Sequence, residues 1–161
     1  MAIYTGDNWG EPPIGTVLQR VVTTNSTQTS YSTYRSGHTL ISRSITPKFS
    51  NSIIEVKWCY MCHAQGSYDG LHFRLSRGAD QLATSGITRA TDAISTPGTQ
   101  AFFFQESAGS TNSRTYTLTV HDCNNDGGTL WWNRPQYTGV TNSNDYLQCA
   151  QSFVAVTEYA Q

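Results

Sequence analysis

The sequence is poor in charge. Only 13% of its 161 residues are Asp, Glu, Lys or Arg, and ten basic residues nearly balance eleven acidic ones. An average globular protein carries about 25% charged residues. Binding to nucleic acid or to an anionic membrane needs clustered basic side chains, and here they are scattered singly along the chain. We therefore expect neither nucleic acid nor membrane as a partner.

Long hydrophobic runs and helical patterns are also missing. No stretch approaches the ~20 apolar residues that cross a bilayer. Because Met1–Tyr4 lacks the basic and apolar regions of a signal peptide, we expect a protein used without Sec-type secretion. Its four cysteines would then begin as thiols. Apolar residues do not recur at the helical spacing, which predicts almost no helix.

Catalytic motifs are absent from the sequence as well. There is no glycine-rich phosphate loop, nucleophile elbow or spaced pair of carboxylates. His121 and Asp122 are adjacent, but neighbours on a strand point to opposite faces and cannot act as one acid–base pair. We therefore expect no enzymatic activity and no cofactor.

The amino-acid composition and the pattern of apolar residues are instead typical of β-sheets. Aromatic residues reach 12% and Thr and Ser are abundant, and β-branched and aromatic residues suit a pleated, half-buried surface. Apolar side chains alternate with polar ones in two neighbouring segments, which predicts strands with one buried face. The predicted inward residues are Ile54, Val56, Trp58, Tyr60 and Cys62 in the first segment and Leu71, Phe73 and Leu75 in the second. We interpret residues 52–76 as one long hairpin, in which Tyr60 lies opposite Leu75 and His63 lies opposite His72.

The whole pattern predicts an all-β protein with a single domain. Turn residues separate about nine short strands, the spacing typical of an antiparallel β-sandwich of the jelly-roll kind. The predicted strands are Thr16–Thr23, His38–Thr46, Ile53–Ala64, Leu71–Arg77, Gln81–Ser85, Gln100–Gln105, Arg114–Asp122, Thr129–Asn133 and Gln148–Tyr159. We assign residues 15–161 to the sandwich. Residues 1–14 do not alternate and contain prolines, so we assign them to an extended N-terminal arm.

Cysteines and histidines offer only weak candidates for a metal site. Cys59 and Cys62 form the one CxxC motif, but on a strand their side chains leave from opposite faces. One tetrahedral metal cannot be reached from both faces, and the distance is too long for a disulfide. Cys123 and Cys149 have no second CxxC partner, and whether they form a disulfide is left open. We expect no bound metal.

Two aromatic segments are candidate contact surfaces. Phe102-Phe103-Phe104 breaks the strand alternation, so at least one ring faces away from the core of its own sheet. Together with the Trp131-Trp132 pair, these rings exceed what one thin sandwich can cover. We therefore expect a homo-oligomer, with a trimer favoured. The predicted oligomer interface is Phe102, Phe104 and Trp131.

The segment after Trp131 is a candidate glycan site. Flat aromatic rings beside amide and guanidinium groups suit sugar rings, and the candidate residues are Trp132, Asn133, Arg134 and Tyr137. The alternative is that one tryptophan packs in the core and the other at an edge or subunit interface. The arm is a second candidate binding element, because Ile3, Tyr4 and Trp9 are apolar anchors and Pro12 and Pro13 stiffen its exit. It could instead fold back on its own sandwich.

Several motifs in order resemble a domain common in virion proteins of tailed bacteriophages, often of tail-fibre type. The resemblance covers residues 15–161. It is carried by Gly15-Thr16-Val17-Leu18-Gln19, Ser44-Ile45-Thr46-Pro47, Ile53-Ile54-Glu55-Val56, Phe73-Arg74-Leu75-Ser76-Arg77-Gly78, Thr115-Tyr116-Thr117-Leu118 and Thr157-Glu158-Tyr159-Ala160-Gln161. It implies a β-sandwich virion module that acts by binding, usually in a symmetric oligomer. This chain departs from it in its many Cys and Trp residues and in lacking a fibre shaft.

The missing shaft favours one role within that family. A tail fibre needs a rod to carry its tip, and no repeat or heptad pattern is present. The resemblance therefore implies a capsid decoration (cement) protein on the virion surface, assembled in the host bacterial cytoplasm. Its partner would be the major capsid protein or another virion protein. The alternative is a tail-fibre or head-fibre tip module that binds glycan on the host surface.

The opposed faces of Cys59 and Cys62 lead to a testable prediction. Chelator and reductant should leave the melting temperature unchanged, and thiol titration of the unfolded protein should return four free cysteines. Thermal melts with and without each reagent provide the measurement. A large fall with chelator would instead indicate a metal site at Cys59, His63 and His72.

Overall fold

The computed structural model describes residues 12–27, 29–33, 37–65, 71–87, 98–122, 128–133 and 151–161. These residues form strands and turns, and none of them is helical. No membrane-spanning helix is found in this part of the chain. The strands are β1 (Val17–Asn25), β2 (Thr29–Thr33), β3 (His38–Ile45), β4 (Ile53–Gln65), β5 (Leu71–Arg77), β6 (Asp80–Ile87), β7 (Gly98–Ser107), β8 (Arg114–Asp122), β9 (Gly128–Trp132) and β10 (Ser152–Tyr159).

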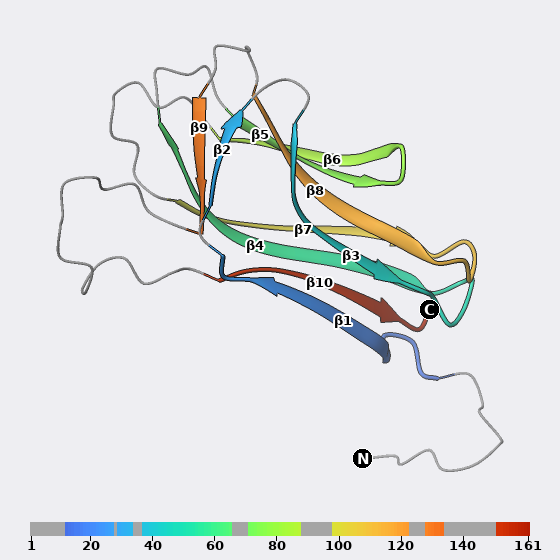
Figure 1. Ribbon diagram of the computed structural model, residues 1–161. Coiled ribbons are helices and arrows are strands. Elements are labelled where there is room, and N and C mark those ends of the chain that lie inside the picture. Colours follow the sequence, from blue (N-terminus) through green and yellow to red (C-terminus); the bar gives the residue numbers. More distant parts are fainter. Residues whose placement is uncertain are drawn as a thin grey trace.

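The strands form two antiparallel sheets that pack face to face, so the predicted β-sandwich is confirmed (Figure 1). The small sheet has the order β3-β8-β5-β6, and the six-stranded large sheet has the order β1-β10-β4-β9-β2 with β7 also on β4. The long strand β4 organises the large sheet. One of its edges pairs with β7, and the other pairs first with β10 and then, from Cys62 onward, with β9.

The core lies between the sheets and follows the alternation predicted for β4 and β5. Ile54, Val56, Trp58 and Tyr60 are all buried on one face of β4, and Phe73 and Leu75 are buried on β5. The Tyr60 ring contacts the Phe73 ring across the sandwich, with centroids 4.3 Å apart. The Trp132 ring also stacks on Tyr60, with centroids 5.3 Å apart. Aromatic packing across the two sheets therefore centres on Tyr60.

The predicted hairpin of residues 52–76 is wrong, although the inward faces of its two arms are right. β4 pairs with β7, β9 and β10, whereas β5 pairs with β6 and β8 in the other sheet. His72 lies opposite His121 and not opposite His63. Alternation fixes the face on which a side chain lies, but it does not fix the neighbouring strand. The two apolar faces meet as opposite walls of the core instead of as one sheet surface.

Each of the nine predicted strands has a counterpart in the structure, with boundaries shifted by a few residues. The prediction missed β2, the segment Thr29-Ser-Tyr-Ser-Thr33, which pairs along its length with β9. β2 has no alternating apolar residues, so its pairing was not visible from periodicity.

The position of Phe73 allows a direct test of the core. Phe73 is 1% exposed, and truncation to alanine should destabilise the fold by about 3–5 kcal/mol through lost burial and a residual cavity. Ile14→Ala is the control because that side chain is 84% exposed, and its cost should stay within about 0.5 kcal/mol. Denaturant unfolding of both variants gives the comparison. Equal costs would contradict the assigned core.

Candidate binding surface at the arm end of the sandwich

One end of the sandwich gathers the start of β1, the β3–β4 connection, the β7–β8 connection and the end of β10 (Figure 1). We call it the arm end because the predicted arm joins β1 here. Backbone hydrogen bonds tie its segments together. Gly15 N donates to the Ala160 carbonyl at 2.8 Å, and Ala160 N donates to the Thr16 carbonyl at 2.9 Å. Ala108 N donates to the Ser52 carbonyl at 2.8 Å, which joins the two loops.

A buried carboxylate, that of Glu158, holds three of these segments. The side chain is 0% exposed and points inward with Val154 and Val156. The Ser52 hydroxyl donates to its Oε1 at 2.7 Å, and Gln19 Nε2 donates to its Oε2 at 2.6 Å. The backbone N–H groups of residues 48 and 49 also donate to the carboxylate, at 2.8 and 3.1 Å. Every close donor is neutral, so the charge is held by hydrogen bonds instead of an ion pair.

These donors set the titration of Glu158. Burial raises the pKa of the carboxyl, but the hydrogen bonds from Ser52, the backbone of Lys48, Gln19 and the backbone of Phe49 outweigh burial. The pKa therefore lies below the usual value for glutamate. Near neutral pH the site holds a carboxylate anion, which only accepts hydrogen bonds and is therefore matched by the surrounding donors. We call Glu158 and these donors the Glu158 cradle.

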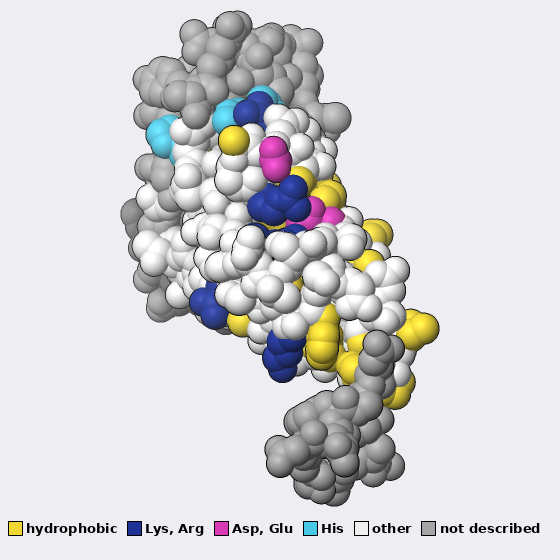
Figure 2. Space-filling model, turned by 90° about the vertical axis from the view of Figure 1, so that its right-hand side faces the viewer, with side chains coloured by type: hydrophobic (Ala, Val, Ile, Leu, Met, Phe, Trp, Pro, Cys, Tyr) yellow, Lys and Arg dark blue, Asp and Glu magenta, His cyan; other side chains and the backbone are white. Residues whose placement is uncertain are grey.

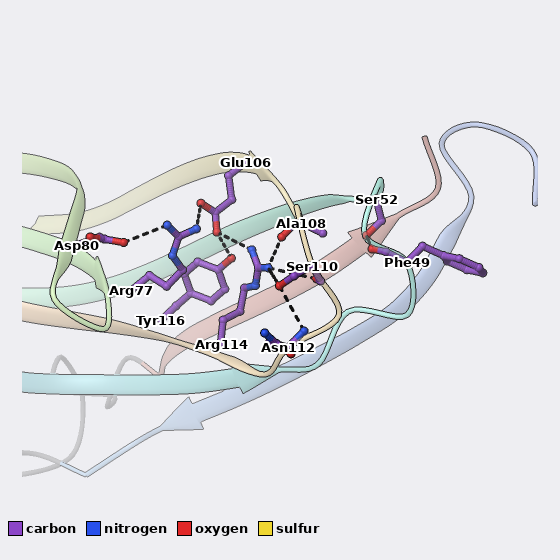
Figure 3. Close-up of polar contacts among 10 residues, drawn as sticks. All are labelled: Phe49, Ser52, Arg77, Asp80, Glu106, Ala108, Ser110, Asn112, Arg114 and Tyr116. Atoms are coloured by element: carbon purple, nitrogen blue, oxygen red, sulfur yellow. Dashed lines mark hydrogen bonds and ion pairs between the residues drawn. The ribbon is translucent and has the colours of Figure 1, made fainter.

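A second polar cluster stabilises the β7–β8 connection (Figure 3). Glu106 on β7 accepts hydrogen bonds from Arg77 on β5, and from Arg114 and Tyr116 on β8. Arg114 continues to the loop, where Nη2 donates to the carbonyl oxygens of Ala108 and Ser110. Burial and the hydrogen bond to Glu106 raise the pKa of the Tyr116 hydroxyl, so it stays protonated and donates.

The cluster holds the loop but leaves little charge for a ligand. Arg77 also pairs with Asp80 at 3.1 Å, so two guanidinium groups meet two carboxylates. An open groove of about 620 Å³ beside it is lined mainly by small polar residues such as Ser107, Gly109 and Asn112. The groove lining contains no aromatic ring on which a sugar could stack. We therefore interpret the cluster as support for the loop.

The exposed apolar residues of the arm end form its candidate contact surface. Ile14 is 84% exposed, Val17 is 53% exposed and Phe49 is 44% exposed. Phe49 and Pro12 line a small pocket of about 60 Å³ with Ala160 and Gln161. Figure 2 looks onto this end and shows hydrophobic side chains gathered on its lower right side, and in Figure 3 Phe49 points away from the sandwich. We call Pro12, Ile14, Val17 and Phe49 the arm-end patch.

The predicted arm anchors are only partly within the described residues. Ile3, Tyr4 and Trp9 lie outside them. Pro12 is half-buried and Pro13 is exposed, and the Pro13 carbonyl accepts a hydrogen bond from Thr16 N at 3.0 Å. This bond forms a turn that leads directly into β1. The contact role of the arm therefore stays a prediction.

The predicted oligomer interface lies partly on the core side. Phe102 and Phe104 are half-buried and pack against the core, while Phe103 is the ring that faces outward. The prediction that one of these rings faces away from the core is therefore confirmed, although the interface assignment did not name Phe103. The side chain of Trp131 lies outside the described residues.

Two of the candidate glycan residues are unavailable to a ligand. Trp132 and Asn133 are each 0% exposed, so neither can contact a sugar in this structure. Asn133 Nδ2 donates to the backbone carbonyls of Asn25 and Thr27, and its Oδ1 accepts from Ser152. Asn133, at the end of β9, therefore connects that strand to β1 and β10. Arg134 and Tyr137 lie outside the described residues.

The thiol and imidazole groups do not assemble into a described metal centre. Cys59 is a free, half-buried cysteine. The side chains of Cys62 and His63 lie outside the described part of the chain, as do Cys123 and Cys149. His72 and His121 stack with ring centroids 5.0 Å apart. Among the described residues no three His, Cys, Asp or Glu side chains are placed to hold a metal ion.

Sequence reasoning missed the two carboxylates that stabilise the arm end, the buried Glu158 and the half-buried Glu106. A signal for Glu158 was present, because the alternation of β10 places it on the inward face with Val154 and Val156. A charged residue at a core position predicts a dedicated set of hydrogen-bond donors. Those donors come from Gln19 and Ser52, which are far from Glu158 in the sequence. Their identity could not be read from the pattern.

The fold and the arm end together define an antiparallel β-sandwich domain whose candidate site is a contact surface. No protein-family model and no curated protein matches the sequence. The structure of the infectious bursal disease virus Gt strain matches with a TM-score of 0.43 and 11% identity, over 99% of this chain and 42% of that chain. The crystal structure of the VP2 subviral particle of that virus matches with a TM-score of 0.37 and 12% identity, over 89% and 42%.

This chain therefore spans about two fifths of the length of those matched chains, 42% in each case. Because the identities and TM-scores are this low, the function proposed below is based on the residues of this chain and on its resemblance to the phage domain.

The Glu158 cradle predicts a specific pH dependence of stability. Because the folded pKa is lowered, the carboxylate stabilises the fold above about pH 4.3, the usual pKa of glutamate, and loses this contribution as pH falls through the folded value. Glu158→Gln should cost about 2–3 kcal/mol at pH 7, since it removes charged acceptors from several buried donors. It should also flatten the acid limb of the stability curve.

Denaturant unfolding at a series of pH values between pH 7 and pH 2 measures both effects. The acid limb of the stability curve lies below ~pH 4, and the plateau lies above it. Asp80→Asn is the control, because the Asp80 side chain is 67% exposed and its single ion pair should contribute little. An acid limb as steep in Glu158→Gln as in the parent protein would contradict the role of the cradle.

Proposed function

We propose that this protein is a bacteriophage virion structural protein that decorates and reinforces the outer shell of the capsid. The arm end is its docking surface, and the major capsid protein is its partner. The observation that carries the proposal is the arm-end patch, in which the exposed side chains of Ile14, Val17 and Phe49 lie with the half-buried Pro12. The resemblance to phage virion domains supplies the class of partner.

The support beneath the patch favours docking. The Glu158 cradle binds the backbone of Phe49 directly, and the Gly15–Ala160 hydrogen bonds fix the exit of the arm. A surface that is already rigid loses less conformational entropy on binding, so more of its contact energy appears as affinity. Exposed aromatic side chains such as Phe49 commonly dominate interface energy. The arm, with Ile3, Tyr4 and Trp9, would extend the contact on the shell.

The alternative proposal is a tail-fibre or head-fibre tip that binds host-surface glycan. Two of its candidate residues, Trp132 and Asn133, are buried. The remaining candidates, Arg134 and Tyr137, lie outside the described residues. A stacking ring is the usual basis of sugar recognition by such a surface, and the buried Trp132 cannot supply it. The decoration role is therefore the better supported of the two.

Binding to undecorated capsids tests the proposal. The parent protein should bind in a saturable manner, and both deletion of residues 1–13 and the double variant Ile14→Ser/Phe49→Ser should weaken binding about tenfold or more. Co-sedimentation with purified shells measures the bound fraction. Val22→Ser is a matched control, because Val22 has the same 44% exposure as Phe49 but lies in mid-strand on β1.

The outcomes separate the parts of the surface. If the deletion alone still saturates the shell, the sandwich base is the anchor and the arm is not. If both changes leave binding intact, the arm end is not the docking surface. Retention on a glycan array without binding to shells would support the fibre-tip alternative.

A further inference from the structure

β7 is an edge strand without the usual protection against pairing. One of its edges pairs with β4, and no other strand of the described residues pairs with its free edge. Its ladder with β4 runs from Gly98 to Ser107 without any irregularity. A long, regular and apolar edge strand presents unpaired N–H and C=O groups that template pairing with another chain.

The other edges of the described sheets differ from β7. β1, β3 and β6 lie in ladders with an irregular register, and β2 has only five residues. Bulges and short lengths are devices that discourage edge-to-edge contact. The single charged residue of β7, Glu106, is neutralised by Arg77 and Arg114. No charge on β7 itself therefore opposes a second strand.

The sequence of β7 is nearly symmetric about Phe103. Three of the pairs equally distant from Phe103 are alike, namely Phe102 and Phe104, Gln100 and Glu106, and Thr99 and Ser107, while Ala101 corresponds to Gln105. A two-fold contact between identical chains places residue i of one copy opposite residue j of the other and the reverse, so a nearly symmetric strand meets similar side chains on both sides of the axis. The occupant that β7 fits is therefore a second copy of itself.

We infer that two copies of this protein pair through β7, antiparallel and centred on Phe103, so that the large sheet continues from one copy into the other. In this register Phe103 lies opposite its own counterpart, and the two outward rings cover each other. The neighbouring outward side chain on β4, Lys57, is already paired with Glu55 at 2.8 Å, so like charges do not meet near the axis. The 72% exposure of Phe103 in the single chain is thereby explained.

This inference does not depend on the capsid, and it replaces the favoured trimer with a dimer. The first measurement is the solution mass of the full chain at high micromolar concentration by light scattering. We expect twice the monomer mass. Phe103→Lys should weaken dimerisation about tenfold or more, because it places two like charges directly opposite each other. Val22→Lys is the matched control on the same outer face, and it should leave the dimer intact.

Cysteine cross-linking tests the register. Under mild oxidation Phe103→Cys should form an intermolecular disulfide, because residues directly opposite in a ladder have Cβ atoms about 4.5–5.5 Å apart. Ala101→Cys is made together with Cys59→Ser, because Cys59 lies directly opposite Ala101 on β4 and would compete for it. This variant alone should not form the intermolecular bond, but its mixture with Gln105→Cys should. The parent protein under the same conditions controls for its native cysteines.

A monomeric or trimeric parent protein would overturn the inference, as would a dimer that Phe103→Lys leaves unchanged. Cross-linking of Ala101→Cys as efficient as that of Phe103→Cys would overturn the register. The arm-end variants should keep the dimer mass, so failure of shell binding and failure of dimerisation are distinguishable. Melting temperatures close to that of the parent protein show that each variant is folded.

Discussion

The carboxylate of Glu158 is the interaction on which the arm end depends. β10 brings the charge into the sandwich, and the loop between β3 and β4 wraps its backbone N–H groups and Ser52 around it. That loop is also one of the connections by which the chain passes from the small sheet to the large one. A single anion therefore fixes both this connection and, through Gln19, the beginning of strand β1. Burying it is tolerable only because its oxygen atoms are well supplied with donors.

The polar groups of this protein are used mainly for structure. Glu158, Glu106 and Asn133 each join segments that are distant in the sequence, and their partners are already engaged in those contacts. What faces outward among the described residues is hydroxyl-rich strand surface, with exposed apolar side chains at the arm-end patch and at Phe103. These exposed apolar side chains are the basis of the contacts proposed above.

The sequence predicted strands and buried faces well because side-chain alternation reports directly on local geometry. Trp58 and Phe73 were assigned to the core correctly. Strand partners were not predictable in the same way, since the small and large sheets present identical alternation. The Trp131-Trp132 pair shows a related limit, because adjacent aromatics leave open which one faces inward. The burial of Trp132 is decided by its stacking on Tyr60, a contact between distant segments.

β10 and then β9 pair with the same edge of β4, and the point where one pairing ends and the next begins is a seam in the large sheet. Asn133, which has a positive φ of 56°, makes hydrogen bonds across this seam. The β1–β10 pair belongs to the arm end, while the β2–β9 pair lies beyond the seam. The two parts of the sheet are nevertheless joined across the seam, because Trp132 at the end of β9 packs in the common core against Tyr60. A change at Asn133 or Trp132 would therefore be transmitted from the β2–β9 pair to the β1–β10 pair and to the core.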